Sequence, residues 1–403
     1  MGQNNKGKIF QLKCKNPDCN FTISTSGDPT ALQKRLFDSG CPCCSGREFS
    51  ANYETSDFDS KEVAISDLSV IIPFYGVETF AKDCIESVLR QDVNSMDVYL
   101  VDDGSKDKCH EICDSFLFDP RVIVIHKKNA GLSMARNTAL EFIHSEYVTF
   151  VDGDDKLLDN FSGYSRIIAA LSESGADLAY FGYVLHKEGE EPRLPESLSG
   201  QGYSLMDKKE SLDFFFDRVE TIYCSAVWNK MVKSSLFSSA RYVPGVYCQD
   251  LRMMPNLLRQ TNSSVTINET MVSYLTQRKG AITRSINPKL IFDRMMAVKD
   301  CLDFAKETGN HKYIEITAKF FAKYLVAAYY AAWKGISPDP EERKKQINLE
   351  YMRTIKAAFR EEKNIILSKT YISEKKKRFA LRMFGLSRYA FVAYNRISKS
   401  FDL

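Results

Sequence analysis

The sequence predicts an α/β protein with a doubly wound, Rossmann-like sheet, a small cysteine-rich N-terminal module and a helical C-terminal region. Short apolar, β-branched runs alternate with helical patterns from Leu68 to Asp152, which is typical of parallel strands joined by helices. Five of the 11 cysteines fall within the first 52 residues, which hold too few apolar residues for a large core. Strand patterns fade after residue 286, and long helical patterns follow.

Each element of the alternation has its own signal. Apolar runs predict four strands, over 68–74, 96–103, 121–126 and 147–152. Apolar residues at helical spacing predict three helices between them, over 78–91, 108–118 and 132–144. Polar residues follow each strand, and right-handed crossovers bring the carboxyl ends of such strands to one rim, where ligands bind. These rim residues are Pro73, Tyr75, Asp102, Asp103, His126 to Asn129, Asp152 and Asp154.

Changes of composition along the chain predict its division into parts. We expect a cysteine-rich module over 1–52, an acidic linker over 53–66, the α/β domain over 67–285 and a helical region over 286–403. The net charge of +3 gives no reason to expect nucleic-acid binding. The N-terminus has no apolar signal segment, and the longest apolar run, 324–333, is too short to cross a bilayer. We therefore expect a cytoplasmic chain whose cysteines are thiols or metal ligands.

The stretch YVTFVDGDDK, residues 147–156, ends an apolar strand in three carboxylates. Asp152 and Asp154 are two residues apart and point the same way in extended chain, with Gly153 leaving room for a close ligand. Such a pair suits Mg²⁺ or Mn²⁺, which would also hold diphosphate oxygens. A solvated acidic turn is the alternative. A phosphatase with an aspartyl nucleophile would need Thr or Val where Lys156 stands.

Several motifs together resemble one family. LSVIIPFYG, VDDGSKD, NAGLSMARN and VDGDD occur in this order at spacings of about thirty residues, and WNKMVKSSLF, CQDLRM and YLTQRKGAIT follow. Together they resemble the family 2 glycosyltransferases of the GT-A fold, over roughly residues 67–285. The resemblance implies inverting transfer of a sugar from a nucleotide-sugar donor to a hydroxyl of a glycan or lipid-linked acceptor. Cell-surface polysaccharide or glycolipid synthesis would be the setting.

The resemblance also implies roles for matching residues. Asp103 would accept a hydrogen bond from the imide of the base, which favours a UDP-linked donor, while Asp102 would only form the turn. Asp154 would bind the metal, and Asp152 the metal and the ribose. Arg278 would neutralise the leaving diphosphate. The full set of nucleotide-sugar-binding residues is Pro73, Tyr75, Glu78, Asp103, Asn129, Gly131, Arg136, Asp152, Trp228 and Arg278.

Catalysis would fall to Asp250, as the base that deprotonates the acceptor hydroxyl. The family usually has Glu before this Asp, and Gln249 stands there. Three assignments have structural alternatives: Asp250 as a helix N-cap, Arg136 in a surface salt bridge, and Trp228 packed in the core rather than stacked on the sugar. Asp155 is expected to cap the helix that follows it. Gly76 replaces the Asn that the family has after the Tyr.

The N-terminal cysteines predict a metal site. Cys14 and Cys19 are followed by Cys41-Pro-Cys43-Cys44, two paired-thiol turns that suit a tetrahedral structural Zn²⁺. We expect Cys14, Cys19, Cys41 and Cys44 as the ligands, with Cys43 able to replace Cys41 or Cys44. Free buried thiols are the alternative. The module has only a few basic residues, so we expect it to serve docking or scaffolding rather than nucleic-acid binding.

The C-terminal tail from Lys369 is basic and aromatic. It suits an interfacial helix on an anionic membrane, and packing of its aromatic face on the protein is the alternative. Two other function classes remain open. A sugar-nucleotide nucleotidyltransferase would need a Gly-rich, Arg-bearing phosphate loop after the first strand, and FYGVETF is not one. A non-enzymatic zinc-ribbon adaptor with a degenerate transferase domain would not need the intact aspartates.

Overall fold

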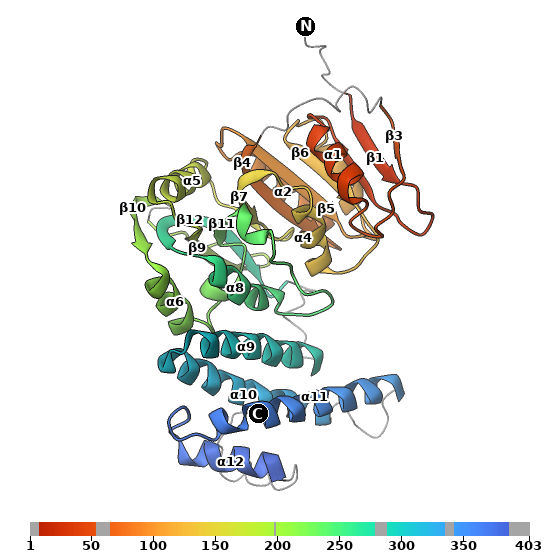
Figure 1. Ribbon diagram of the computed structural model, residues 1–403. Helices are drawn as coiled ribbons and strands as arrows, with labels where there is room; N and C mark the ends of the chain where they lie inside the picture. The colour runs from red at the N-terminus through yellow and green to blue at the C-terminus, as the bar shows by residue number, and fades with distance from the viewer. Residues whose placement is uncertain (1–7, 54–64, 197–198, 279–287, 335–341, 387–403) are drawn as a thin grey trace. The chain divides into compact units, whose positions relative to one another are not determined.

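The computed structural model describes residues 8–53, 65–196, 199–278, 288–334 and 342–386 (Figure 1). The chain divides into two compact units. The first consists of residues 1–211, 226–245 and 257–279, and it contains the sheet. The second consists of residues 212–225, 246–256 and 280–403, and it is helical.

The centre of the sheet is parallel, as predicted. Strand β4 lies between β5 and β7, and β6 pairs with β5, all in parallel. These strands match the predicted positions within two residues: β4 is Ser66–Phe74, β5 Met96–Asp102, β6 Val122–His126 and β7 Ser145–Phe150. Their apolar side chains are almost fully buried because helices cover both faces of such a sheet. The predicted doubly wound fold is confirmed.

The sheet is mixed because later strands extend it beyond β7. Its order is β10-β12-β9-β11-β7-β4-β5-β6-β2-β1-β3, and β8 pairs with β12. Strand β11 is antiparallel to both β7 and β9, and β12 runs parallel to β9. The bounds are β8 Lys156–Leu157, β9 Leu178–Lys187, β10 Ser199–Met206, β11 Lys230–Lys233 and β12 Ser264–Thr276, with a 3₁₀ turn, η2, at Ser234–Phe237.

The predicted helices form between the parallel strands. They are α2 Glu78–Leu89, α3 Cys109–Ser115 and α4 Leu132–Leu140, with α5 at Gly163–Ser174 after β8. The apolar face of α2 buries Cys84, Ile85 and Val88 in the main core, which explains its helical spacing. Helix α4 ends four residues earlier than predicted. Phe142 continues its apolar pattern from the following turn, where it stacks on Phe21.

The N-terminal module continues the central sheet. It consists of β1 Phe10–Cys14, β2 Thr22–Thr25, α1 Thr30–Ser39 and β3 Phe49–Ala51. Strand β1 is antiparallel to β2 and β3, and β2 is antiparallel to β6, with Thr22 opposite His126. The sheet therefore runs without a break from the cysteine-rich segment into the α/β domain. The sequence signals for strands are local and could not reveal this pairing.

The second unit holds the C-terminal helices α9 Pro288–Thr308, α10 His311–Lys334, α11 Glu342–Ile366 and α12 Lys375–Leu386, with α7 Ile222–Ser225. Helices α6 Lys208–Asp217 and α8 Gln249–Gln260 have residues in both units. Among the described residues, no helix is both long and apolar enough to cross a membrane.

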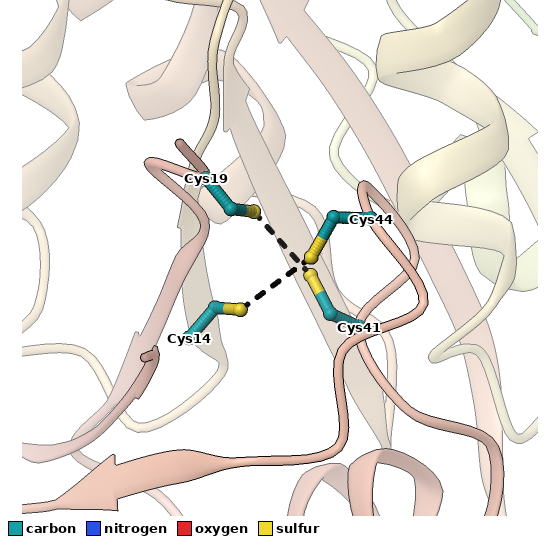
Figure 2. A group of neighbouring side chains, drawn as sticks. All are labelled: Cys14, Cys19, Cys41 and Cys44. Carbon is teal, nitrogen blue, oxygen red and sulfur yellow. Dashed lines mark hydrogen bonds between the residues drawn. The ribbon is translucent and has the colours of Figure 1, made fainter. Parts of the chain in front are cut away.

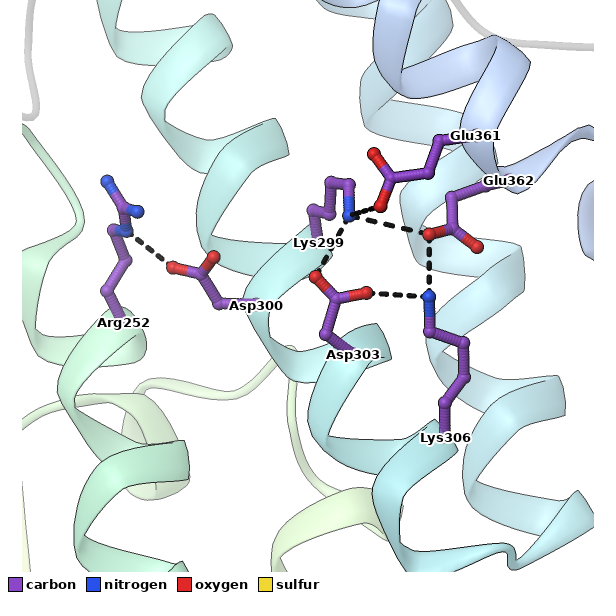
Figure 3. A network of polar contacts seen from close by, with 7 residues as sticks. All are labelled: Arg252, Lys299, Asp300, Asp303, Lys306, Glu361 and Glu362. Atoms are coloured by element: carbon purple, nitrogen blue, oxygen red, sulfur yellow. Dashed lines mark hydrogen bonds and ion pairs between the residues drawn. The ribbon is translucent and has the colours of Figure 1, made fainter.

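An ion-pair network joins α9 to α11 (Figure 3). Lys299 Nζ lies 2.9 Å from Asp303, 2.8 Å from Glu361 and 3.4 Å from Glu362. Lys306 Nζ lies 2.7 Å from both Asp303 and Glu362. The three carboxylates are close enough together to resemble a metal site. The two ammonium groups offset most of their charge, so the cluster has a structural explanation without a metal ion.

Candidate functional site

The carboxyl ends of the parallel strands are tied to one another. The backbone N–H of Asp103 donates to the carbonyl of Phe74 at 3.0 Å, and the N–H of Lys127 donates to that of Asp102 at 3.1 Å. The N–H of Val151 reaches the carbonyl of Ile71 at 3.1 Å. The predicted rim therefore exists, and residues that follow four different strands lie along it.

Asp103 holds the loop that follows β6. Its side chain is 2% exposed, and its carboxylate accepts from Lys127 Nζ. It also accepts from the backbone N–H of Ala130, at 3.1 Å, and of Gly131, at 2.7 Å. The predicted contact with a nucleotide base would require these bonds to be exchanged. In this structure the role of Asp103 is to fix residues 127–131, hereafter the β6–α4 loop.

Gly104 allows the β6–α4 loop to approach closely. Its φ of +69° lies in the left-handed region, and a Cβ at this position would sit 2.7 Å from the backbone nitrogen of Asn129. Gly131 ends the loop as the N-cap of α4, with a φ of +87°. The predicted nucleotide contacts Asn129 and Gly131 thus belong to one constrained loop, and the N–H of Gly131 is bound by Asp103.

Asp102 is structural, as predicted, and the structure adds its partner. Its carboxylate accepts from the N–H of Ser105 at 2.9 Å and lies 3.2 Å from His126 Nδ1. His126 Nε2 lies 3.0 Å from Asp114. Burial alone would lower the pKa of His126, but the two carboxylates outweigh it and raise this pKa to about 9. An imidazolium between two carboxylates therefore holds the ends of β5 and β6 to α3.

The three carboxylates after β7 each have a partner. Asp152 accepts from Arg136 Nη2 at 2.6 Å, and Asp154 accepts from Arg278 Nε at 2.8 Å. Asp155 accepts from the backbone N–H of Leu275 at 2.7 Å. Two guanidinium groups and one amide thus offset the repulsion among the acids. Asp152 and Asp154 each accept a hydrogen bond from an arginine through one carboxylate oxygen.

Arg136 is buried rather than exposed. It has no accessible surface, and its guanidinium lies 5.7 Å from the ring centroid of Phe150 and 5.3 Å from that of Tyr242. This excludes the surface salt bridge as its alternative role. A buried cation needs a nearby anion, and Asp152 provides it. Arg136 thereby fixes the direction in which Asp152 points.

Two expectations about this turn are wrong. Asp155 does not cap a helix, because β8 follows it and its carboxylate binds β12 instead. Gly153 does not leave room for a ligand. A Cβ there would lie 2.8 Å from the carbonyl oxygen of Pro73 and 2.6 Å from the ring of Phe74, so strand β4 occupies that space.

Burial shapes the protonation of the acids. The pKa of Asp154 is raised by burial and by the charge of Asp152, although Arg278 opposes this. The pKa of Asp155 is raised well above its usual range by burial and by the charges of Asp154 and Asp152. Its Oδ2 is buried and has no hydrogen-bond partner among the described residues. Asp155 is therefore the acid that most readily keeps its proton, while Asp152 and Asp154 remain the pair suited to a cation.

Comparison with known proteins gives this site its family. Residues 69–232 match the model for glycosyl transferase family 2. The chain carries a family 2 glycosyltransferase domain. The matched region lies within residues 67–285, which resemble the family in sequence, and it contains β5, β6, β7 and most of β4.

Relatives and a solved structure agree with this. Glycosyltransferase GlyA of Streptococcus pneumoniae serotype 4 is 30% identical over 223 residues, 54% of this chain and 31% of that protein. Minor teichoic acid biosynthesis protein GgaB of Bacillus subtilis is 36% identical over 93 residues, 22% of this chain and 10% of that protein. The chain thus matches less than a third of either relative's length.

The structure of S. aureus TarS residues 1–349 in complex with UDP-GlcNAc superposes with a TM-score of 0.57. It is 17% identical and covers 82% of this chain and 89% of that chain. A likeness at this identity shows the fold alone, and the GT-A fold is confirmed.

The predicted nucleotide-binding residues at the end of β4 and just after it differ in exposure. Tyr75, just after β4, is 51% exposed, whereas Pro73 is buried within the strand. Glu78 opens α2, and its carboxylate accepts from the backbone N–H of Lys108 at 2.8 Å. Tyr75 is therefore available to a ligand, and Glu78 already ties α2 to the turn before α3.

Trp228 lies in the core of the transferase domain. It is 3% exposed, and its ring stacks on Tyr274 with centroids 4.7 Å apart. Tyr183 contacts it edge-on at 4.9 Å. The expectation of a sugar-stacking wall is wrong, because neighbouring rings and burial leave no open face. Core packing, the alternative, is what the structure shows.

Asp250 lies in the second unit, in the first turn of α8. The helix begins at Gln249, so Asp250 is inside the helix rather than its N-cap. Its role as base stays a prediction. Arg278 binds Asp154, and the end of the motif YLTQRKGAIT, residues 279–283, lies outside the described residues.

No specific role was predicted for Lys127. In the structure its side chain is buried and its Nζ donates to Asp103. Its position directly after β6, inside the predicted rim, was the available signal.

The four predicted cysteine ligands also come together, as Figure 2 shows for Cys14, Cys19, Cys41 and Cys44. Cys43 is exposed and is not part of this group, which favours the first of the two ligand sets.

Proposed function

We propose that this protein is an inverting, metal-dependent glycosyltransferase that moves a hexosyl or N-acetylhexosaminyl group from a UDP-linked donor to a hydroxyl of a glycan or lipid-linked acceptor. The observation that carries the proposal is the pairing of Asp152 with Arg136 and of Asp154 with Arg278 at the rim of a family 2 domain. Carboxylates held in place at the end of a strand suit a cation, and the long cationic side chain of Arg278 beside them suits a diphosphate.

Asp152 and Asp154 are the residues that would hold Mg²⁺ or Mn²⁺. Such an ion supplies charge neutralisation on the departing diphosphate. Arg136 keeps Asp152 oriented, because its buried guanidinium has little freedom to turn. Arg278 places a second positive charge beside the same acids and would stabilise the leaving group. Asp250 would take the proton from the acceptor hydroxyl.

The choice of uridine now depends on the family resemblance, because Asp103, which was to read the base, is bound to its own loop. UDP-GlcNAc is the first donor to test, since TarS shares the fold and was solved with it. The teichoic acid role named for GgaB supports a cell-surface polymer as the product. The same proposal places the reaction in the cytoplasm or on the cytoplasmic face of the membrane.

Peripheral contact with an anionic membrane is the remaining part of the proposal. Lys375 and Lys376 at the start of α12 are exposed, and Phe379 is 45% exposed. Leu381 and Phe384 are buried, and Phe384 contacts Tyr329 edge-on. Part of the aromatic face therefore packs within the second unit, and the exposed residues described in α12 that could face a membrane include Lys375, Lys376, Phe379 and Arg382. Co-sedimentation with vesicles containing phosphatidylserine, compared with neutral vesicles, tests it.

Calorimetric binding of UDP and UDP-GlcNAc, with and without Mn²⁺, tests the function. We expect Mn²⁺-dependent binding that Asp154→Asn abolishes. Asp159→Asn is the matched control, because Asp159 follows the same turn and its side chain is 78% exposed. Slow hydrolysis of the bound donor would show enzymatic competence. Absence of binding for uridine, guanosine and thymidine diphosphate sugars with either cation would favour the adaptor alternative and overturn the proposal.

A further inference from the structure

We propose that Cys14, Cys19, Cys41 and Cys44 bind one Zn²⁺, and that this ion is a structural part of the transferase domain that supports the β6–α4 loop. The site goes beyond sugar transfer, and only its expected effect on nucleotide affinity rests on the proposed function.

The four sulfurs have the spacing of a tetrahedral site. Cys14 Sγ lies 3.6 Å from Cys44 Sγ, and Cys19 Sγ lies 3.7 Å from Cys41 Sγ (Figure 2). All four lie within 4.8 Å of one another. Zn–S bonds of about 2.3 Å in a regular tetrahedron place the sulfurs about 3.8 Å apart. A disulfide would need about 2.05 Å. The arrangement therefore matches one ion held by four thiolates.

Backbone amides are directed at the sulfurs. Cys14 receives the N–H of Asn16, Cys19 that of Phe21, Cys41 those of Cys43 and Cys44, and Cys44 that of Gly46. Gly46 passes so close that a Cβ would lie 3.3 Å from Cys44 Sγ. Amides around a metal site stabilise the charge on thiolates and orient them. Buried neutral thiols would gain little from this arrangement, so it favours the metal site over a cluster of free thiols.

The ligands come from the end of β1 and from two of the three connections in the N-terminal module. Cys14 ends β1, Cys19 lies between β1 and β2, and Cys41 and Cys44 lie between α1 and β3. The strands are three to five residues long, and a module of this size buries little apolar surface. One ion would therefore supply much of the stability that a larger core would otherwise provide.

Three contacts lead from the module to the elements on either side of the β6–α4 loop. Strand β2 pairs with β6 up to His126, the residue before the loop. Phe21, whose N–H faces Cys19, stacks on Phe142 after α4 with centroids 5.9 Å apart. Arg35 of α1 forms an ion pair with Glu141 at the end of α4.

The cysteine turn itself is also near the loop. The Cys43 thiol interacts with the ammonium group of Lys127 and with the hydroxyl of Thr138. Lys127 is the residue that binds Asp103. An ion that fixes the Cys41–Cys44 turn would therefore also restrict Cys43, which interacts with Lys127 of the β6–α4 loop.

Metal analysis of the full chain, purified without chelator, tests the site. We expect one equivalent of zinc in the wild type and in Cys43→Ser, and almost none in Cys44→Ser. Cys43 is the matched control because it is a thiol in the same turn but is not one of the four clustered sulfurs. Iron in place of zinc, an unmetallated wild type, or equal zinc loss in both variants would overturn the assignment.

Cobalt replacement covers the case in which Cys44→Ser does not fold. Wild-type protein reloaded with Co²⁺ should show the thiolate charge-transfer and visible bands of a tetrahedral tetrathiolate site, and Cys43→Ser should show them equally. Absence of these bands from protein that has bound Co²⁺ would refute coordination by four sulfurs.

Hydrogen exchange tests the coupling without any nucleotide. Removal of zinc should speed amide exchange in 22–25 and 127–131, and should leave β7 as protected as before. Zinc-dependent exchange in the module alone would refute support of the loop. Where UDP binds the holoprotein, its affinity should fall severalfold on zinc removal. Failure of UDP to bind under any condition would count against the proposed function and leave the zinc results standing.

Discussion

The stability of the first unit should fall as pH rises from 6.5 to 9, because of His126. Its imidazolium lies between Asp102 and Asp114, and its side chain is 22% exposed. A pKa raised from 6.5 to about 9 means that the folded state binds the proton more tightly than the unfolded state. The resulting stabilisation is full below pH 6.5 and is lost as the pH rises through 9. This shift corresponds to at most about 3 kcal/mol.

His126→Gln removes the titration and keeps a side chain that can form hydrogen bonds. We expect the variant to be less stable than wild type by up to about 3 kcal/mol at pH 6.5, and the two to converge near pH 9. The difference between the proteins cancels other groups that titrate in this range. His110→Gln is the control, because His110 is exposed on α3 and should leave the wild-type pH dependence intact.

Urea unfolding followed by tryptophan fluorescence provides the measurement. The chain has two tryptophans, and Trp228 is buried in the first unit. The substitution Trp333→Phe leaves Trp228 as the reporter of this unit. All variants are compared in the Trp333→Phe background. Parallel curves for wild type and His126→Gln between pH 6.5 and 9 would show that the imidazolium does not stabilise the fold.

Three further predictions concern the transferase domain and the base. Gly153→Ala should lower the free energy of unfolding by about 1–3 kcal/mol, because its Cβ would meet the carbonyl of Pro73; an unchanged urea midpoint would contradict the close approach. Trp228→Phe should destabilise the fold by about 1–3 kcal/mol and leave the KM for the donor unchanged, whereas a raised KM with unchanged stability would restore the sugar-stacking role. Asp250→Asn should reduce turnover by about 10²–10⁴-fold and keep UDP binding, measured by calorimetry, and full turnover would remove Asp250 as the base.

The central strands, the rim and the four clustered cysteines could be predicted from the sequence. Alternating apolar runs and helical patterns are local signals, and they placed β4 to β7 within two residues of their positions. Cys14, Cys19, Cys41 and Cys44 could be chosen because paired thiols at short spacing are also local. The sequence could not choose against Cys43, because exposure depends on how the turn folds.

The tertiary structure decided what each polar side chain binds. Asp103 is bound to Lys127, Arg136 to Asp152 and Asp155 to Leu275, and these partners lie between 16 and 120 residues apart in sequence. Pairing of β2 with β6, which joins the cysteine module to the sheet, is equally distant. A motif fixes which chemical groups are present and roughly where along a strand they fall. Long-range packing decides which of these groups form hydrogen bonds within the protein and which face a ligand. A buried charge needs a partner, and only the fold determines which residue lies beside it.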